Sequence, residues 1–134
     1  GVKKCCREIG MGIIAFSPLA QGMLTDRYLH GIPEDSRVRT DGRFLNERSL
    51  SSEMLEKIRK LNEIAKERGQ TLAQMALSWV YAKKGVTSVL IGASKPQQIV
   101  ENISMQTKAS FTEEELRKAI YVYQSRDRRF GGLK

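Results

Sequence analysis

The chain has 134 residues, 40% of them hydrophobic and 28% charged, a composition typical of one small globular domain and not of a disordered segment. No apolar run approaches the ~20 residues that a membrane-spanning helix needs, and the first residues lack an apolar stretch of signal-peptide length, so we expect a cytoplasmic protein without a membrane partner. The formal net charge is +8, from 23 Lys and Arg against 15 Asp and Glu, which raises nucleic acid or a small anionic ligand as partners.

The first part of the chain predicts the end of a helix, a strand and a long irregular segment. The helix covers residues 2–9 and stops at Gly10. The short apolar run 12–16 is typical of a strand buried on both faces, as in a parallel sheet. The stretch 22–52 that follows is polar and has little periodicity, and irregular segments of this length are often functional.

Two helices are predicted in the middle of the chain. Ser51 or Ser52 caps the first, which ends at Gly69. Its apolar face is expected to comprise Met54, Ile58, Leu61 and Ala65. Thr71 and Gln74 form a capping-box pattern that opens the second helix, which Gly85 ends. The buried stripe of that helix is expected to comprise Leu72, Met75, Ala76, Trp79 and Val80.

A second strand and two further helices follow. The strand covers the β-branched run 86–91, and a turn over 92–94 leads into a helix with Pro96 in its first turn. The buried face of this helix is expected to comprise Ile99, Val100 and Ile103. A capping box over 111–115, with Phe111 as a staple, opens the last helix, and the basic tail 126–134 is expected to fray. The last helix is expected to be lined by Leu116, Ala119, Ile120 and Tyr123.

These elements form two strand–loop–helix units with extra helices, a pattern that predicts an α/β fold with a parallel sheet. Two strands are too few for a stable parallel sheet. Each strand is expected to need neighbours that this chain does not contain, so residues 1–134 are predicted to form a single partial domain. Its open strand edges would favour self-association or pairing with a missing part.

Both candidate binding loops follow a strand, on the side where parallel α/β folds bind ligands. In the first loop, Ser17 offers a hydroxyl, Pro18 stiffens the turn and Gly22 allows close backbone approach. An ordinary strand-to-loop turn explains these residues equally well.

The second loop runs from Gly92 to Gln98, where a strand ends in Gly-x-Ser and a helix begins at once. Unpaired backbone N–H groups and the positive helix end would bind an anion, with Ser94 as a further donor and Lys95 adding charge. Three polar residues, Gln98, Glu101 and Asn102, are expected on the side of the helix away from its apolar face. The alternative is a capped helix with a solvated polar face.

No catalytic or metal site is predicted. Cys5 and Cys6 are adjacent, so a bond between them would be strained, and no Cys/His spacing accompanies the single histidine, His30. No nucleophile lies beside a base, and the run from Glu113 to Glu115 is typical of a helix start. We expect no nucleic-acid partner, because no aromatic interleaving or helix-turn-helix pattern accompanies the positive charge.

Several segments, in one order over about residues 10–116, resemble the aldo-keto reductases. They are 14–22, 31–33 with Ser36 and Arg37, 73–79, and 88–96 with Glu101 and Asn102. The likeness is strongest to the branch that contains potassium-channel β subunits and bacterial glyceraldehyde-3-phosphate reductase. It implies the C-terminal portion of a (β/α)8 TIM barrel, with NADPH or NADP+ lying across the barrel mouth and a small carbonyl substrate. Asp35 departs from the channel-subunit branch, which has an aromatic residue there.

The resemblance also implies roles for individual residues. Phe16 would stack near the nicotinamide, and the ribose and pyrophosphate would lie along Ser17, Pro18, Leu19, Ala20 and Gly22. Arg27 and Arg37 occupy positions of basic residues over the cofactor. The 2′-phosphate and adenine would contact Gly92, Ser94, Gln98, Glu101 and Asn102. The family's catalytic Asp, Tyr, Lys and His would lie upstream of Gly1, so this segment alone is expected to be inactive. A non-catalytic, NADPH-sensing regulatory module is the alternative function.

Overall fold

A computed structural model describes residues 1–40 and 50–124 of the chain. The helices and strands, in chain order, are α1 (Val2–Glu8), β1 (Ile13–Phe16), η1 (Ala20–Gly22), η2 (Asp26–Tyr28), α2 (Arg37–Thr40), α3 (Ser52–Glu67), α4 (Leu72–Tyr81), β2 (Val86–Leu90), α5 (Pro96–Ile103), η4 (Ser104–Lys108) and α6 (Glu113–Gln124). The predicted order of strands and main helices is therefore confirmed. Among its described residues the predicted irregular segment contains the short helices η2 and α2, and its residues 41–49, like the tail 126–134, lie outside the described residues.

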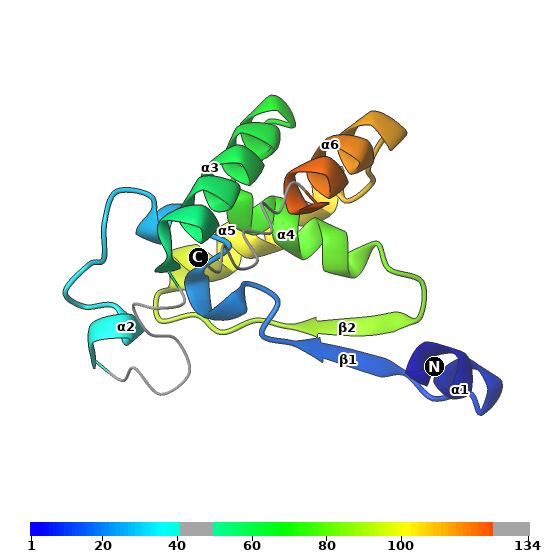
Figure 1. Cartoon of the computed structure of the whole chain (residues 1–134). Helices are drawn as coiled ribbons and strands as arrows, with labels where there is room; N and C mark the ends of the chain where they lie inside the picture. The colour runs from blue at the N-terminus through cyan, green and yellow to red at the C-terminus, as the bar shows by residue number, and fades with distance from the viewer. Residues whose placement is uncertain (41–49, 125–134) are drawn as a thin grey trace, which may run out of the picture.

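The two strands form a parallel two-stranded sheet, as the sequence predicts. Figure 1 shows α4 between this sheet and the outer pair of helices α3 and α6, which pack against each other. The main core lies among these helices. It comprises Leu29, Ile58, Ile64, Ala65, Leu72, Met75 and Val122. A smaller cluster of Tyr28, Val38 and Leu50 shows that the predicted irregular segment contributes buried side chains of its own.

Local sequence signals account for where the helices begin. The Ser51 side chain accepts a hydrogen bond from Met54 N at 3.2 Å, and so caps α3. Thr71 and Gln74 form the predicted reciprocal capping box at the start of α4. The same pattern recurs at α6, where Thr112 and Glu115 exchange hydrogen bonds of 2.8 and 3.2 Å. These caps satisfy backbone donors that no helix can satisfy within itself.

The prediction of strands buried on both faces is wrong for this chain. Ile14, Phe16 and Leu90 are 68, 79 and 61% exposed, because the helices of the described residues cover only one side of the sheet (Figure 1). The predicted buried face of α5 is also exposed, and Asn102 is the buried residue of this helix. Met54 and Ile120 are exposed as well, whereas Trp79, Val80, Leu116 and Ala119 are half-buried. The side chain of Tyr123 lies outside the described part of the chain.

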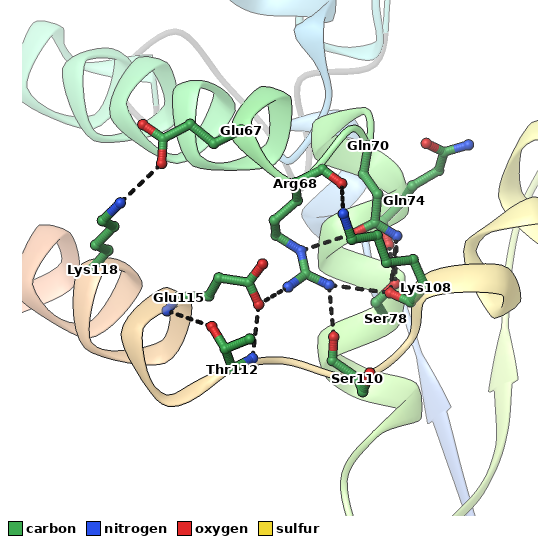
Figure 2. Close-up of polar contacts among 10 residues, drawn as sticks. All are labelled: Glu67, Arg68, Gln70, Gln74, Ser78, Lys108, Ser110, Thr112, Glu115 and Lys118. Atoms are coloured by element: carbon green, nitrogen blue, oxygen red, sulfur yellow. Dashed lines mark hydrogen bonds and ion pairs between the residues drawn. The ribbon is translucent and has the colours of Figure 1, made fainter.

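A buried arginine at the end of α3 joins the turn between α3 and α4 to the segment that leads into α6. Arg68 is 2% exposed, and Figure 2 shows its guanidinium reaching Gln70, Glu115 and two backbone carbonyls. Its Nε donates to Gln70 Oε1 at 2.9 Å, and Nη2 donates to the carbonyls of Lys108 and Ser110 at 3.1 and 3.0 Å. Nη1 forms an ion pair with Glu115 Oε2. Each polar group of the guanidinium therefore has a partner, as burial of a charge requires.

The Arg68 guanidinium also contacts an aromatic ring, which packs against a second one. Its guanidinium carbon lies 3.8 Å from the centre of the Phe111 ring, which in turn meets Trp79 edge-on at 5.6 Å. The Lys83 ammonium lies over the Trp79 ring, with Nζ 3.2 Å from the ring centre. Burial, and then repulsion from Lys3, lower the pKa of Lys83. The predicted staple Phe111 thus packs between the Arg68 guanidinium and the Trp79 ring, and its face adds a cation–π contact to the buried charge.

Acid is expected to weaken this helical part of the protein through Glu115. Burial alone would raise the pKa of its carboxyl, but hydrogen bonds from Thr112 and the charge of Arg68 outweigh burial and lower the pKa. Glu115 therefore stabilises the fold above the unfolded pKa of about 4.3, and this contribution is lost as the pH falls through the lower folded value. Urea unfolding of the wild type and of Glu115→Gln should thus differ at pH 7 and converge toward pH 3.

Glu113→Gln is the control for that measurement, because the Glu113 side chain is 91% exposed and faces only an exposed arginine at 3.8 Å. It should follow the wild type at every pH, since exposed ion pairs contribute little. A wild-type advantage over Glu115→Gln that stays constant from pH 7 to pH 3 would contradict the assignment.

Candidate functional site

The register of the two strands places both candidate loops at one edge of the sheet. Ile13 pairs with Val86 at the amino ends, and Phe16 pairs with Leu90 at the carboxyl ends. The loops that leave these carboxyl ends therefore start side by side, as Figure 1 shows. Phe16, the last residue of the first strand, is 79% exposed there. One ligand could contact both loops from this edge.

The first loop folds tightly because several residues adopt left-handed backbone conformations. The φ angles are 55° at Ser17, 47° at Ala20, 60° at Gln21 and 97° at Gly22. Such conformations cost a non-glycine residue on the order of 1–3 kcal/mol and gather at functional sites. A glycine is the residue type that readily adopts a positive φ, but nothing in the sequence distinguishes Ala20 and Gln21 as residues that would do so. Neither of these two conformations was predicted.

Backbone hydrogen bonds hold this loop in shape. Ala20 N donates to the Ser17 carbonyl at 3.0 Å, and Leu19 O accepts from Gly22 N and Leu24 N at 2.9 and 3.2 Å. The Thr25 hydroxyl donates to the Gly22 carbonyl at 2.6 Å. Ser17 is exposed, whereas the predicted contacts Pro18, Leu19, Ala20 and Gly22 are half-buried. The loop thus presents the Ser17 side chain on a backbone that is fixed at several points.

In the second loop, the side chain of Gln98 closes the turn. Its Oε1 accepts from Ser94 N at 2.8 Å, from the Ser94 hydroxyl at 3.2 Å and from Lys95 N at 3.2 Å. The structure therefore shows the capped helix that the sequence left as an alternative. Three donors nevertheless converge on one oxygen, which is the arrangement that an anion requires. An anion that used these donors would have to replace Oε1 as their acceptor.

Gly92 lies beside open space. A Cβ built at this position meets no heavy atom within 4 Å, and the backbone φ is not one that favours glycine. Local backbone geometry thus gives no reason for a glycine here. A ligand that approaches the backbone would give one.

Four further predicted contacts differ in how the structure places them. Arg27 Nη2 pairs with Asp35, at 2.9 Å from its carboxylate and 3.2 Å from its carbonyl oxygen. Asp35, the residue that differs from the channel-subunit branch, therefore holds one of the two predicted arginines. Arg37 begins α2, and its side chain lies outside the described part of the chain. Glu101 is exposed, but Asn102 is only 7% exposed and does not lie on a solvated polar face.

The residue that sequence reasoning missed at this site is Gln74. Its Nε2 donates to the Glu101 carbonyl at 3.1 Å and to the Ser104 hydroxyl at 2.8 Å. The capping-box pattern explains Gln74 completely within its own helix, so its second role could not be predicted from the sequence.

Two classes of site find no support within the residues that the structure describes. Across residues 1–40 and 50–124, no three His, Cys, Asp or Glu side chains gather as a metal ion would require. Within the same ranges, every helix is too short or too polar to span a lipid bilayer.

Comparison with known proteins places the chain in a class. Residues 1–120 match the model of the aldo/keto reductase family, and the chain belongs to that family. Over 119 residues it is 51% identical to an L-glyceraldehyde 3-phosphate reductase of Escherichia coli O157:H7, covering 87% of this chain and 34% of that protein. Over 123 residues it is 41% identical to a probable voltage-gated potassium channel subunit beta of Oryza sativa subsp. japonica, covering 90% of this chain and 38% of that protein. The chain thus spans about a third of the length of these relatives.

Proposed function

We propose that this chain binds NADPH or NADP+ as the C-terminal portion of a (β/α)8 barrel, in an aldo-keto reductase that reduces aldehydes or ketones to alcohols. The parallel pairing of Phe16 with Leu90 carries the proposal, because it starts both candidate loops at one edge of the sheet. Family membership supports it, since nicotinamide cofactors and carbonyl substrates are general in this family. In this proposal residues 1–134 form one partial domain whose exposed strands pair with the rest of the barrel.

The cofactor would span the two loops. Phe16 would contact the nicotinamide, and the first loop through Gly22 would follow the ribose and pyrophosphate. Arg27 and Arg37 would lie over the cofactor. The three donors of Ser94 and Lys95 that now converge on Gln98 would bind the 2′-phosphate. The adenine would lie beside Gln98, Glu101 and Asn102.

The chemistry divides between this chain and the remainder of the barrel. When bound, NADPH supplies the hydride that reduces the carbonyl carbon. The residues of this chain would hold and orient it, which counts because correct orientation alone lowers a barrier substantially. No residue of this chain is assigned as the proton donor. Residues 1–134 alone should therefore show no turnover of glyceraldehyde or other aldehydes with NADPH.

Titration of the full-length protein with NADPH and NADH tests the cofactor site. Lys95→Met removes a charge beside the proposed 2′-phosphate position, so NADPH affinity should fall about five- to tenfold, as expected for the loss of a charge-assisted contact. NADH lacks the phosphate, and its affinity should stay within about twofold of the wild type on the same reasoning. Isothermal titration calorimetry measures both values.

Lys84→Met is the matched control, since Lys84 is exposed and precedes β2 at the opposite end of the strands. It removes the same charge and should leave both affinities unchanged. If the full-length protein bound neither NADPH nor NADP+, the proposed function would be wrong.

A regulatory module that senses NADPH without turning over a substrate is the second candidate. The 41% identity to a probable potassium channel subunit beta favours it. The two functions differ in one measurement on the full-length protein. A reductase consumes NADPH when an aldehyde is added, whereas a pure sensor binds NADPH without consuming it.

A further inference from the structure

The amide of Gln74 links the start of α4 to the end of α5. Its Oε1 accepts from Thr71 N at 2.8 Å, which completes the helix cap, while Nε2 donates to Glu101 O and Ser104 Oγ. The Ser104 hydroxyl donates onward to the Glu101 carbonyl at 2.7 Å. Figure 2 shows Gln74 on the same helix as Ser78, whose hydroxyl accepts a hydrogen bond from Gln70, a partner of Arg68, so the link ties α5 to the helix that borders the Arg68 network.

The chemistry of the contacts fixes the orientation of this amide. The Thr71 N–H requires an acceptor, and the Glu101 carbonyl requires a donor, so exchanging oxygen and nitrogen would break both bonds at once. Glutamate at this position would keep the cap, because its carboxylate accepts from Thr71 N as glutamine does. It would also place a second oxygen against the Glu101 carbonyl, where neither atom can donate. The two functions of Gln74 can therefore be separated by one substitution.

The helix α5 depends on few attachments among the described residues. Ile99, Val100 and Ile103 are 45, 62 and 53% exposed, and the helix packs on α4 and η4. The Gln74 link holds its last turn, at Glu101 and Ser104. The opposite end of the same short helix carries Gln98 and the turn at Ser94. A shift at the last turn would move both ends, because a helix of this length moves as one rigid body.

We propose that Gln74 is a positioning residue for the adenosine-phosphate half of the cofactor. It touches no part of the proposed ligand and acts by holding α5 in place. This inference rests on the proposed function, since it requires NADP(H) to lie along Ser94, Gln98 and Glu101. The nicotinamide half lies along the first loop, which Gln74 does not contact in the structure.

The test measures binding of 2′,5′-ADP, which carries the adenosine 2′-phosphate half without the nicotinamide, to the full-length protein. Gln74→Glu should weaken 2′,5′-ADP and NADPH by the same factor, about fivefold, as the loss of two interhelix hydrogen bonds predicts. In a turnover assay the KM for NADPH should rise while kcat stays unchanged. Ser104→Ala should give a smaller loss in the same direction, because it leaves the bond to the Glu101 carbonyl.

Two controls distinguish a loss of affinity caused by a displaced helix from one caused by lower stability or by the added negative charge. Thr71→Ala removes the hydroxyl that caps Gln74 N but keeps both the Thr71 N–Gln74 bond and the link, so it should lower the unfolding midpoint and leave affinity unchanged. Gln106→Glu adds the same negative charge at an exposed position of η4 and should bind 2′,5′-ADP as the wild type does. Wild-type affinity in Gln74→Glu, or equal losses in Gln74→Glu and Thr71→Ala, would overturn the positioning role alone. Failure of the unchanged protein to bind 2′,5′-ADP and NADPH would overturn both proposals.

Discussion

Replacing Arg68 with methionine is expected to lower the free energy of unfolding by about 3–5 kcal/mol, the usual effect of removing one partner from a buried ion pair. The loss is large because the guanidinium serves four acceptors: Gln70, Glu115 and the carbonyls of Lys108 and Ser110. Methionine fills a similar volume but leaves these acceptors without their donor. Urea unfolding followed by circular dichroism at pH 7 measures the difference.

Two companion variants show whether the guanidinium geometry matters. Arg68→Lys keeps the charge but cannot reach four acceptors in a plane, so it should lose an intermediate amount of stability. Arg59→Met is the matched control on α3, since Arg59 is 51% exposed and pairs with Glu56 at 3.5 Å. It should change the free energy by no more than about 0.5 kcal/mol. Equal effects of Arg68→Met and Arg59→Met would show that the buried network contributes little.

The Arg68 network was beyond the reach of sequence reasoning, although the capping boxes were not. The boxes at Thr71 and Thr112 join residues three apart, so a local pattern reveals them. The partners of Arg68 on the far segment, by contrast, lie 40 to 47 residues away. Arg68 is also one of 23 basic residues, and nothing beside it in the sequence distinguishes it. Its burial depends on how the helices pack, which periodicity does not specify.

The same distinction applies to the strands and to α5. Apolar runs predicted both strands correctly and their parallel pairing as well. They also predicted burial, because β-branched and apolar residues in a strand normally meet a second layer. In the described residues that second layer is present on one side only, so Phe16 and Leu90 stay exposed. The apolar pattern of a strand thus indicates the packing neighbours to which the strand is suited. The described residues supply only part of those neighbours.

At the candidate site, the sequence was informative where chemistry requires a particular residue type. The link through Gln74 combines a local cap, which sequence patterns reveal, with contacts about 30 residues away, which they do not. The left-handed conformations of Ala20 and Gln21 are likewise set by the hydrogen bonds of the folded loop. Gly22 is the member of this loop whose residue type matches its conformation. It therefore offers the most direct test of the first loop.

Gly22→Ala is expected to weaken NADPH binding by the full-length protein about tenfold. Alanine at a φ of 97° is strained by about 1–2 kcal/mol, and the added Cβ meets only Tyr28 Cε2 at an ordinary 3.7 Å, so strain rather than collision drives the change. The loop would spend less time in the conformation shown here, and affinity falls with the population of the binding-competent state. Isothermal titration calorimetry with NADPH measures the loss.

Gly85→Ala is a close control, because Gly85 has a φ of 92° and its Cβ would lie 4.0 Å from the nearest atom, Ile13 Cδ1. The backbone strain is therefore the same, but Gly85 precedes β2 at the amino end of the strands, away from both loops. Both variants should lose similar stability, since each places alanine in a left-handed conformation. Only Gly22→Ala should also lose affinity for NADPH. If Gly85→Ala weakened NADPH as much, the loss would follow from general destabilisation, and the first loop would have no part in holding the cofactor.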